Sequence, residues 1–230
     1  MLNSKKIVLW TGLGYLLIFI TGFFSNFFVL ESNFFMGDAG ATIEAISANE
    51  QLFRIGIAAF VIMVITDVIL ALPLYYLFRD VNPVLAMLSS VLRVVNGSLF
   101  AVALFFLVKI MVNIPIYPVS GAENVLDEFE AFDLMWKVGL IFFGIHLFIL
   151  AHLMLKKANF PKLIGGSMML AGLGYLIDSF AMIILMNYEE HASIFEMIVL
   201  IPAVIGELSF TVFLLIKGIK GNELIRPELF

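Results

Sequence analysis

The sequence predicts an all-α fold, a polytopic membrane protein built as a bundle of six transmembrane helices. Hydrophobic residues make up 62% of the 230 residues and charged residues only 13%. Soluble globular chains are usually about 45–50% apolar and about 25% charged. The mean hydropathy of +1.08 agrees, and the apolar residues fall into long runs with charged residues between them. A surface so poor in charge is expected to face lipid rather than water.

Six apolar runs are each long enough for a helix that crosses a bilayer, which takes about 20 residues. The first run follows Lys5 and Lys6, as a signal peptide would, but its apolar core is longer than the about 7–15 residues of such a leader. We therefore expect six membrane helices within one transmembrane domain that covers residues 1–230, at 7–30, 52–78, 83–112, 133–155, 163–187 and 194–216.

The charged residues between the runs predict which side of the membrane each segment occupies. If the N-terminus is inside, the internal segments hold nine of the 13 basic residues: Lys5, Lys6, Arg79, Lys156, Lys157, Lys162, Lys217, Lys220 and Arg226. The external segments then hold 12 of the 18 acidic residues: Glu31, Asp38, Glu44, Glu50, Glu123, Asp127, Glu128, Glu130, Asp133, Glu189, Glu190 and Glu196. Short cytoplasmic segments are enriched in Lys and Arg, so both the N-terminus and the C-terminus are expected to be cytoplasmic. The net charge of −5 argues against nucleic acid as a partner.

The two long external segments carry further local signals. Asp38 is a suitable N-cap for a short external helix after the first span, ending near Asn49. Ile43 and Ile46 would share one face of that helix and lie against the bundle or the membrane interface. The acidic run at 127–130 is expected to be a solvated helix start, where acids suit the helix dipole; a vestibule that attracts cations is the alternative.

One five-residue string occurs twice. Gly-Leu-Gly-Tyr-Leu lies at 12–16 in the first span and at 172–176 in the fifth. Both helices would cross the membrane in the same direction, as parallel repeats require. The string indicates either an internal duplication or the small-residue packing that is common between membrane helices. Such small-residue faces would also allow a homodimer.

Ionisable residues at mid-depth are the strongest functional signal. Each costs at least about 2.5 kcal/mol if it faces lipid at the centre of a helix. Five spans carry one such residue near the middle, where a rise of about 1.5 Å per residue places the bilayer midplane. We expect them to face inward around one shared site that binds a ligand or a proton, together with an asparagine one turn from the arginine: Asp67, Arg93, Asn96, His146, Asp178 and Glu207.

The charges of this centre do not balance. Three acids would face one arginine, which stays protonated in proteins. Protonation of an acid, protonation of His146, a bound cation or a basic group of a ligand would relieve the excess negative charge. We therefore expect a pH-sensitive centre with at least one neutral acid.

Catalytic and metal-binding patterns are weaker. The absence of cysteine excludes thiolate metal sites and a cysteine nucleophile. His146 with carboxylates would suit zinc or manganese, but no metalloenzyme spacing supports such a site, so no metal and no cofactor is assigned. A Ser-His-Asp arrangement is available from Ser98 or Ser179 with His146 and Asp178. No residue is assigned a catalytic role.

Several strings resemble a bacterial integral-membrane family catalogued as domain of unknown function four-three-eight-six: GDA at 37–39, LFRIGIA at 52–58, DV at 67–68, GLIFFGIHL at 139–147 and AGLGYLIDS at 171–179. The resemblance covers about residues 7–190. It implies a multi-pass protein of the bacterial cytoplasmic (inner) membrane and carries no biochemical activity. Asp67, His146 and Asp178 lie within the matching strings, and Glu207 lies outside them.

These observations leave three functional hypotheses. The leading one is a membrane protein that binds, or binds and translocates, a small solute, proton or lipid at the polar centre. One alternative is an intramembrane enzyme, metal-assisted or acid–base, that uses His146 and the carboxylates. The other is an accessory or sensor protein in which Arg93 pairs with Asp67 or Asp178 only to hold the bundle together. The expected partners are membrane lipids and a small-molecule or cation ligand.

Overall fold

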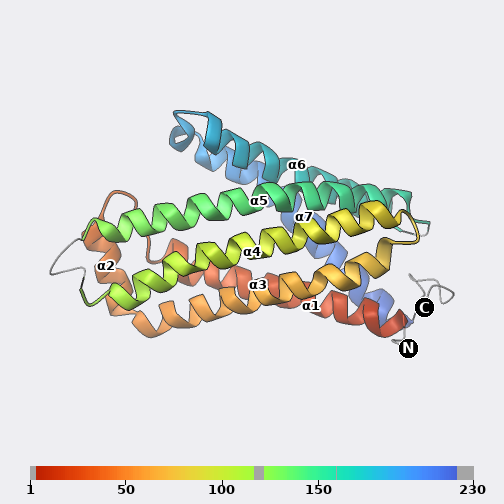
Figure 1. Ribbon diagram of the computed structural model, residues 1–230, viewed down its shortest axis with the longest axis horizontal. Coiled ribbons are helices and arrows are strands. Elements are labelled where there is room, and N and C mark those ends of the chain that lie inside the picture. Colours follow the sequence, from red (N-terminus) through yellow and green to blue (C-terminus); the bar gives the residue numbers. More distant parts are fainter. Residues whose placement is uncertain (1–3, 117–121, 159, 222–230) are drawn as a thin grey trace. The chain divides into compact units, whose positions relative to one another are not determined.

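The computed structural model describes residues 4–116, 122–158 and 160–221. These residues form seven α-helices and contain no β-strand (Figure 1). The helices are α1 (Ser4–Ser25), α2 (Ala39–Ala48), α3 (Glu50–Phe78), α4 (Pro83–Asn113), α5 (Asn124–Lys156), α6 (Lys162–Ile184) and α7 (Ala192–Lys220). Six helical segments are long and apolar enough to cross a membrane: α3 to α7, and a first segment, Lys5–Glu31, in which α1 continues as a π-helix over Asn26–Glu31. The expected all-α membrane fold with six spans is confirmed, and the side on which the termini lie stays a prediction.

The largest difference from the expected spans is at α5, which begins at Asn124, nine residues before the expected membrane span at 133 and three residues before the acidic run that was expected to start a helix. The acidic run at 127–130 is therefore part of a longer helix. Phe129 is buried, and Glu128, whose side chain is 11% exposed, forms an ion pair with Lys109 of α4. The expectation that this run is a solvated helix start is confirmed for Asp127, which is exposed in the first turn of α5, and is wrong for Glu128, whose charge is neutralised by Lys109.

The short helix after the first span is present as expected. The side chain of Asp38 caps α2 by accepting a hydrogen bond from the backbone N–H of Ala41 at 2.9 Å. Gly37 precedes the cap with φ of +75°, a conformation that residues with a side chain rarely adopt. Ile43 and Ile46 are buried on one face of α2, so the expected apolar face is confirmed.

The contacts divide the chain into two compact units, each made of separate stretches. The first unit combines residues up to 16, 67–96 and residues from 139 onward; it holds α6, α7 and parts of α1, α3, α4 and α5. The second unit combines residues 17–66 and 97–138. Every residue proposed above for the polar centre belongs to the first unit.

The second unit is held together by aromatic rings and close helix contacts. The ring of Trp136 stacks on Phe100 with 3.7 Å between centroids and also contacts Phe60. Ser25 donates a hydrogen bond to the backbone carbonyl of Gly56 at 2.7 Å. Burial of large aromatic side chains contributes much of the packing energy in such a cluster.

Within the first unit, α6 and α7 pack closely side by side (Figure 1). A Cβ at Gly174 would lie 2.8 Å from the carbonyl oxygen of Ile198, and a Cβ at Gly206 would lie 3.1 Å from the backbone of Ser167. Pro202 lies inside α7 and cannot donate a backbone hydrogen bond to Ile198. Glycine therefore lets the α6 backbone approach α7 beside this proline.

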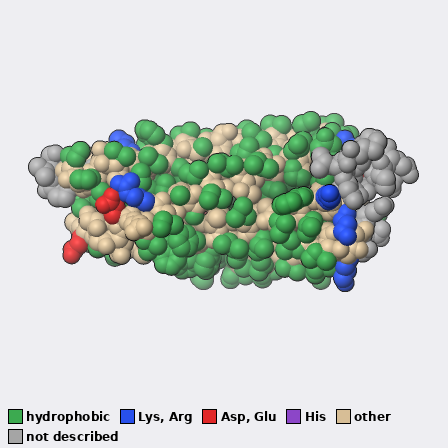
Figure 2. All heavy atoms as spheres, turned by 90° about the horizontal axis from the view of Figure 1, so that it is seen from below, with side chains coloured by type: hydrophobic (Ala, Val, Ile, Leu, Met, Phe, Trp, Pro, Cys, Tyr) green, Lys and Arg blue, Asp and Glu red, His purple; other side chains and the backbone are tan. Residues whose placement is uncertain are grey.

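The outer surface is apolar, as lipid contact requires. Hydrophobic side chains dominate the face drawn in Figure 2. Large apolar side chains along the helices are exposed, among them Ile69 and Leu72 of α3 and Phe105 of α4. In water such a surface would be unfavourable, so it indicates a membrane environment.

A candidate polar centre within the membrane

Arg93 and Asp67 form the core of the centre. Arg93 is 1% exposed and Asp67 is 4% exposed. The guanidinium Nη2 donates to Asp67 Oδ1 at 2.6 Å, and Nε donates to the backbone carbonyl of Asp67 at 3.0 Å. Asp67 lies 11 residues before α3 ends at Phe78, and Arg93 lies ten residues after α4 begins at Pro83. The short connection between the two helices therefore brings these residues to the same depth.

Two further helices supply partners for the same guanidinium. Nη1 of Arg93 donates to the hydroxyl of Tyr15 on α1 at 3.1 Å and contacts Nε2 of His146 on α5 at 3.0 Å. The guanidinium also lies over the rings of Tyr15 and Phe143, 4.9 and 5.8 Å from their centroids. With the two bonds to Asp67, four of the five N–H groups of Arg93 have acceptors.

The contact with Arg93 fixes the hydrogen-bonding role of His146. Arginine can only donate, so Nε2 of His146 must accept. The ring proton therefore lies on Nδ1, which donates to the backbone carbonyl of Ser89 at 2.8 Å. An imidazole with one accepting nitrogen is neutral. The hypothesis that protonated His146 offsets the acids is wrong for this arrangement.

The same geometry argues against the two catalytic patterns considered from the sequence. Both ring nitrogens of His146 are occupied, and a guanidinium faces one of them, which disfavours a metal cation there. Within the described residues, no three His, Asp or Glu side chains are grouped to share a metal ion. The serine within reach of the ring is Ser89, 2.9 Å from Nδ1, not Ser98 or Ser179. Because Nδ1 carries the proton, it cannot act as a base toward that hydroxyl.

Asn96 extends the centre by one turn of α4. It is fully buried, and its amide nitrogen donates to Asp67 Oδ2 at 3.3 Å. The amide oxygen, Oδ1, is also buried and has no hydrogen-bond partner among the described residues. A buried acceptor without a donor is costly, so this atom distinguishes Asn96 from the fully satisfied side chains around Arg93.

Glu207 lies beside the centre on α7. Gly206 packs against the backbone of Ser167 and holds this part of α7 close to α6. Glu207 is half-buried and accepts a hydrogen bond from the hydroxyl of Tyr175 on α6 at 3.3 Å. Glu207 lies close enough to Arg93 for its charge to act on the guanidinium when the carboxyl group is ionised, although no hydrogen bond or ion pair joins the two among the described residues.

Asp178 has a different neighbourhood. Its carboxylate is buried, and Oδ1 accepts a hydrogen bond from the hydroxyl of Tyr188 at 2.7 Å. Tyr188 begins a single turn of 3₁₀-helix after the end of α6. Asp178 is six residues from the last residue of α6, Ile184, which is about 9 Å along the helix. The sequence predicted a longer fifth span, and so placed Asp178 deeper than the structure does.

The structure therefore brings together part of the predicted set. Direct hydrogen bonds connect Asp67, Arg93, Asn96 and His146. Glu207 accepts a hydrogen bond from Tyr175 beside this group, and Asp178 accepts one from Tyr188.

Two tyrosines of the site were missed from the sequence, although a signal was present. Tyr15 and Tyr175 hold the same place in the string that occurs at 12–16 and at 172–176. In both copies the glycines lie against a neighbouring helix: a Cβ at Gly14 would be 2.7 Å from Leu70. This supports the interpretation of the string as close helix packing, which also brings the adjacent tyrosine near a charged residue of another helix.

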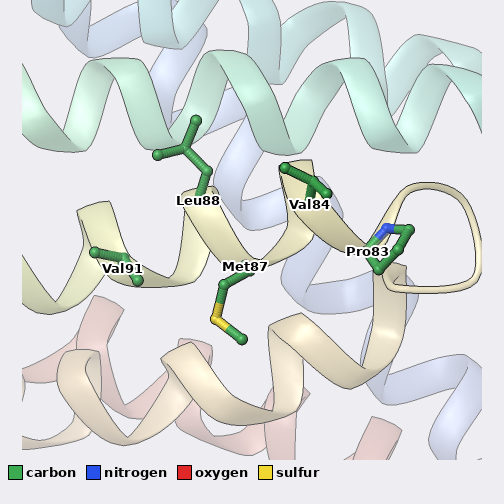
Figure 3. A pocket seen from close by; sticks show the side chains of 5 residues that line it. All are labelled: Pro83, Val84, Met87, Leu88 and Val91. Atoms are coloured by element: carbon green, nitrogen blue, oxygen red, sulfur yellow. The ribbon is translucent and has the colours of Figure 1, made fainter.

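A separate apolar pocket lies at the start of α4. It is lined by Pro83, Val84, Met87, Leu88 and Val91 (Figure 3). These five residues offer no polar side chain, so the pocket has no group that could orient a polar ligand.

Comparison with known proteins relates nearly the whole chain to one family. The family model described as Domain of unknown function (DUF4386) matches residues 10–218. A protein of Archaeoglobus fulgidus, named "Uncharacterized protein", is 31% identical over 169 residues, which cover 74% of this chain and 87% of the relative. No solved structure matches the chain.

Proposed function

The chain belongs to the family of integral-membrane proteins described as Domain of unknown function (DUF4386). We propose that it binds a proton or a small polar solute at the centre around Arg93. Four helices supply the hydrogen-bonded side chains of this centre, and a fifth supplies Glu207. Polar groups that converge inside a membrane protein are characteristic of substrate and ion pathways.

The excess acid, Glu207, is the observation that carries this proposal. Arg93 and Asp67 neutralise each other, and His146 is neutral. Glu207 forms no ion pair with any residue in the described part of the chain. A purely structural role explains the pair of Arg93 and Asp67, but it gives no reason for a further carboxyl group beside them. A proton or the positive group of a solute would neutralise Glu207.

We also propose how the protein is placed in the cell. The charge distribution favours cytoplasmic termini in the cytoplasmic membrane of a prokaryote, with membrane lipids around the bundle. The relative from Archaeoglobus fulgidus is archaeal, so the proposal is not restricted to the bacterial inner membrane expected from the sequence.

Glu207→Gln should change how the stability of the protein depends on pH. Glutamine resembles the protonated acid, so the variant and the wild type should have similar melting temperatures at about pH 5 and differ at about pH 9. At the higher pH, we expect the variant to melt about 2–8 °C higher, because it lacks a charge that costs roughly 1–2 kcal/mol in this half-buried position. Thermal unfolding of the purified protein in detergent measures this difference.

Glu196→Gln provides a matched control on the same helix. Glu196 is exposed, and it precedes Glu207 by 11 residues on α7, so the same chemical change is made away from the centre. The control should follow the wild type at every pH. If Glu207→Gln also follows the wild type from about pH 5 to about pH 9, Glu207 does not bind the proton and the proposal is wrong.

A further inference from the structure

The unpaired amide oxygen of Asn96 points to the chemistry of the bound species. Asn96 is fully buried, and its single hydrogen bond among the described residues uses the amide nitrogen. Oδ1 has two lone pairs and can only accept. Whatever completes this group must therefore donate a hydrogen bond.

Rotating the side-chain amide of Asn96 by 180° would not give its oxygen a hydrogen-bond donor. Exchanging the nitrogen and oxygen of Asn96 would place Oδ1 about 3.3 Å from Asp67 Oδ2, where the nitrogen now lies. Asp67 Oδ1 accepts from Arg93 at 2.6 Å, as an ionised carboxylate does. Two acceptor oxygens would then face each other, which is unfavourable. The orientation in which the amide nitrogen of Asn96 donates to Asp67 Oδ2 is therefore favoured, and Oδ1 of Asn96 still lacks a donor among the described residues.

The distance between the two acceptor atoms limits the size of the donor. In a primary amide, bond lengths of 1.23 and 1.33 Å place the oxygen about 2.2 Å from the nitrogen. Asn96 Oδ1 therefore lies at most about 5.5 Å from Asp67 Oδ2, given the 3.3 Å contact. The O–H or N–H bonds of water and ammonium diverge by about 105–110°, so one such donor makes two hydrogen bonds of about 2.8 Å to acceptors about 4.5 Å apart. This separation lies below the upper limit set by the amide, so the geometry is compatible with a single water-sized molecule between the two oxygens.

The charges around Asn96 indicate whether the bound species is an anion or a neutral or positively charged hydrogen-bond donor. Asp67 is ionised and paired with Arg93, and Glu207 supplies no positive charge in either protonation state. The two atoms of this pair that have acceptor capacity left are Asn96 Oδ1, which has no partner among the described residues, and Asp67 Oδ2, which accepts a single hydrogen bond from Asn96. An anion would be repelled here, whereas a neutral or positively charged donor would be stabilised.

We propose that Asn96 and Asp67 hold a water-sized hydrogen-bond donor between Oδ1 and Oδ2, either a water molecule that exchanges protons with the centre or an ammonium ion. This inference rests on the proposed function, because it names the chemical class that the centre binds. It assigns Asn96 as the selective element and leaves Arg93 as the group that holds Asp67 in place.

The test compares ammonium chloride with sodium chloride at equal ionic strength. Melting temperatures are measured for the wild type, for Asn96→Leu and for Ser90→Ala. Ser90 is the matched control, because it is a buried polar residue of α4 whose hydroxyl is already satisfied by the carbonyl of Ala71 at 2.8 Å. A high-resolution structure of the wild type is determined with and without ammonium, so that the result does not depend on the folding of Asn96→Leu.

Each outcome supports or overturns the inference. An ammonium ion gives a saturable rise in melting temperature in the wild type and Ser90→Ala, and that rise is lost in Asn96→Leu. If the bound donor is water, ammonium chloride and sodium chloride give the same melting temperature, and the maps show a density peak within about 3 Å of Asn96 Oδ1. Maps without such a peak under either condition overturn the inference. The pH experiment on Glu207 does not use Asn96, so the proposed function can hold when this inference fails.

Discussion

Arg93→Met should destabilise the protein by about 3–5 kcal/mol, the usual effect of removing one partner from a buried ion pair. Methionine fills much of the same volume but donates no hydrogen bond. Asp67 would then keep a charge inside the membrane, and Tyr15 and His146 would each lose a donor. For a chain of this length, the melting temperature should fall by about 6–20 °C, which thermal unfolding in detergent can measure.

The double variant Arg93→Met with Asp67→Asn separates the charge from the packing. Asparagine removes the unpaired charge, so the double variant should recover much of the stability lost in Arg93→Met. If the two single losses simply add, the contact of 2.6 Å between Arg93 and Asp67 does not stabilise the fold. Arg93→Lys should recover little, since an ammonium group has three donors and cannot reproduce the planar arrangement around Asp67, Tyr15 and His146.

The fold was predictable because length and hydropathy determine membrane spans almost without tertiary information. Bilayer thickness sets the length of each helix, and no water is present to satisfy an irregular backbone. Hydropathy alone also explains why the span in α5 was expected to begin only at 133. The residues before 133 are acidic, and hydropathy does not show that Glu128 is neutralised by Lys109 or that Phe129 is buried.

The depth of the polar residues could be predicted, but their partners could not. Counting 1.5 Å per residue places Asp67 and Arg93 at one level, because both lie about ten residues from a short connection. Which of the acids reaches Arg93 depends on the rotation of each helix about its axis, which a sequence does not give. Asp178 therefore entered the predicted centre, although the structure places its carboxylate against the hydroxyl of Tyr188 and shows no hydrogen bond between it and Arg93 among the described residues.

The tyrosines were missed for a chemical reason. A tyrosine in an apolar span is compatible with packing, so Tyr15 and Tyr175 carry no signal comparable to a charge at mid-depth. Their hydroxyl groups become informative only with their partners, Arg93 and Glu207. The repeated string around both tyrosines predicted close packing of the helices, and close packing is what allows these side chains to reach across.

Gly172→Ala should destabilise the protein by about 1–3 kcal/mol, the usual cost of overpacking. A Cβ at Gly172 would lie 2.9 Å from both the carbonyl oxygen of Gly144 and the backbone nitrogen of Phe148. These are backbone atoms of α5, so they cannot turn aside as a flexible side chain would. The helices α5 and α6 must separate instead, and thermal unfolding should show a melting temperature lower by about 2–12 °C.

Gly166→Ala on the same helix should stabilise the protein slightly, in contrast to Gly172→Ala. A Cβ at Gly166 would meet no atom within 4 Å, so only the helix preference of alanine remains, worth about 0.5–1 kcal/mol in favour of the variant. Equal effects of the two substitutions would show that α5 and α6 are not in close contact at Gly172.

Separation of α5 and α6 at Gly172 should also weaken the edge contact between Phe143 and Tyr175, whose ring centroids are 5.2 Å apart. Because Tyr175 donates to Glu207, Gly172→Ala should alter the pH dependence of stability as well as its magnitude, whereas Gly166→Ala should leave the pH dependence unchanged.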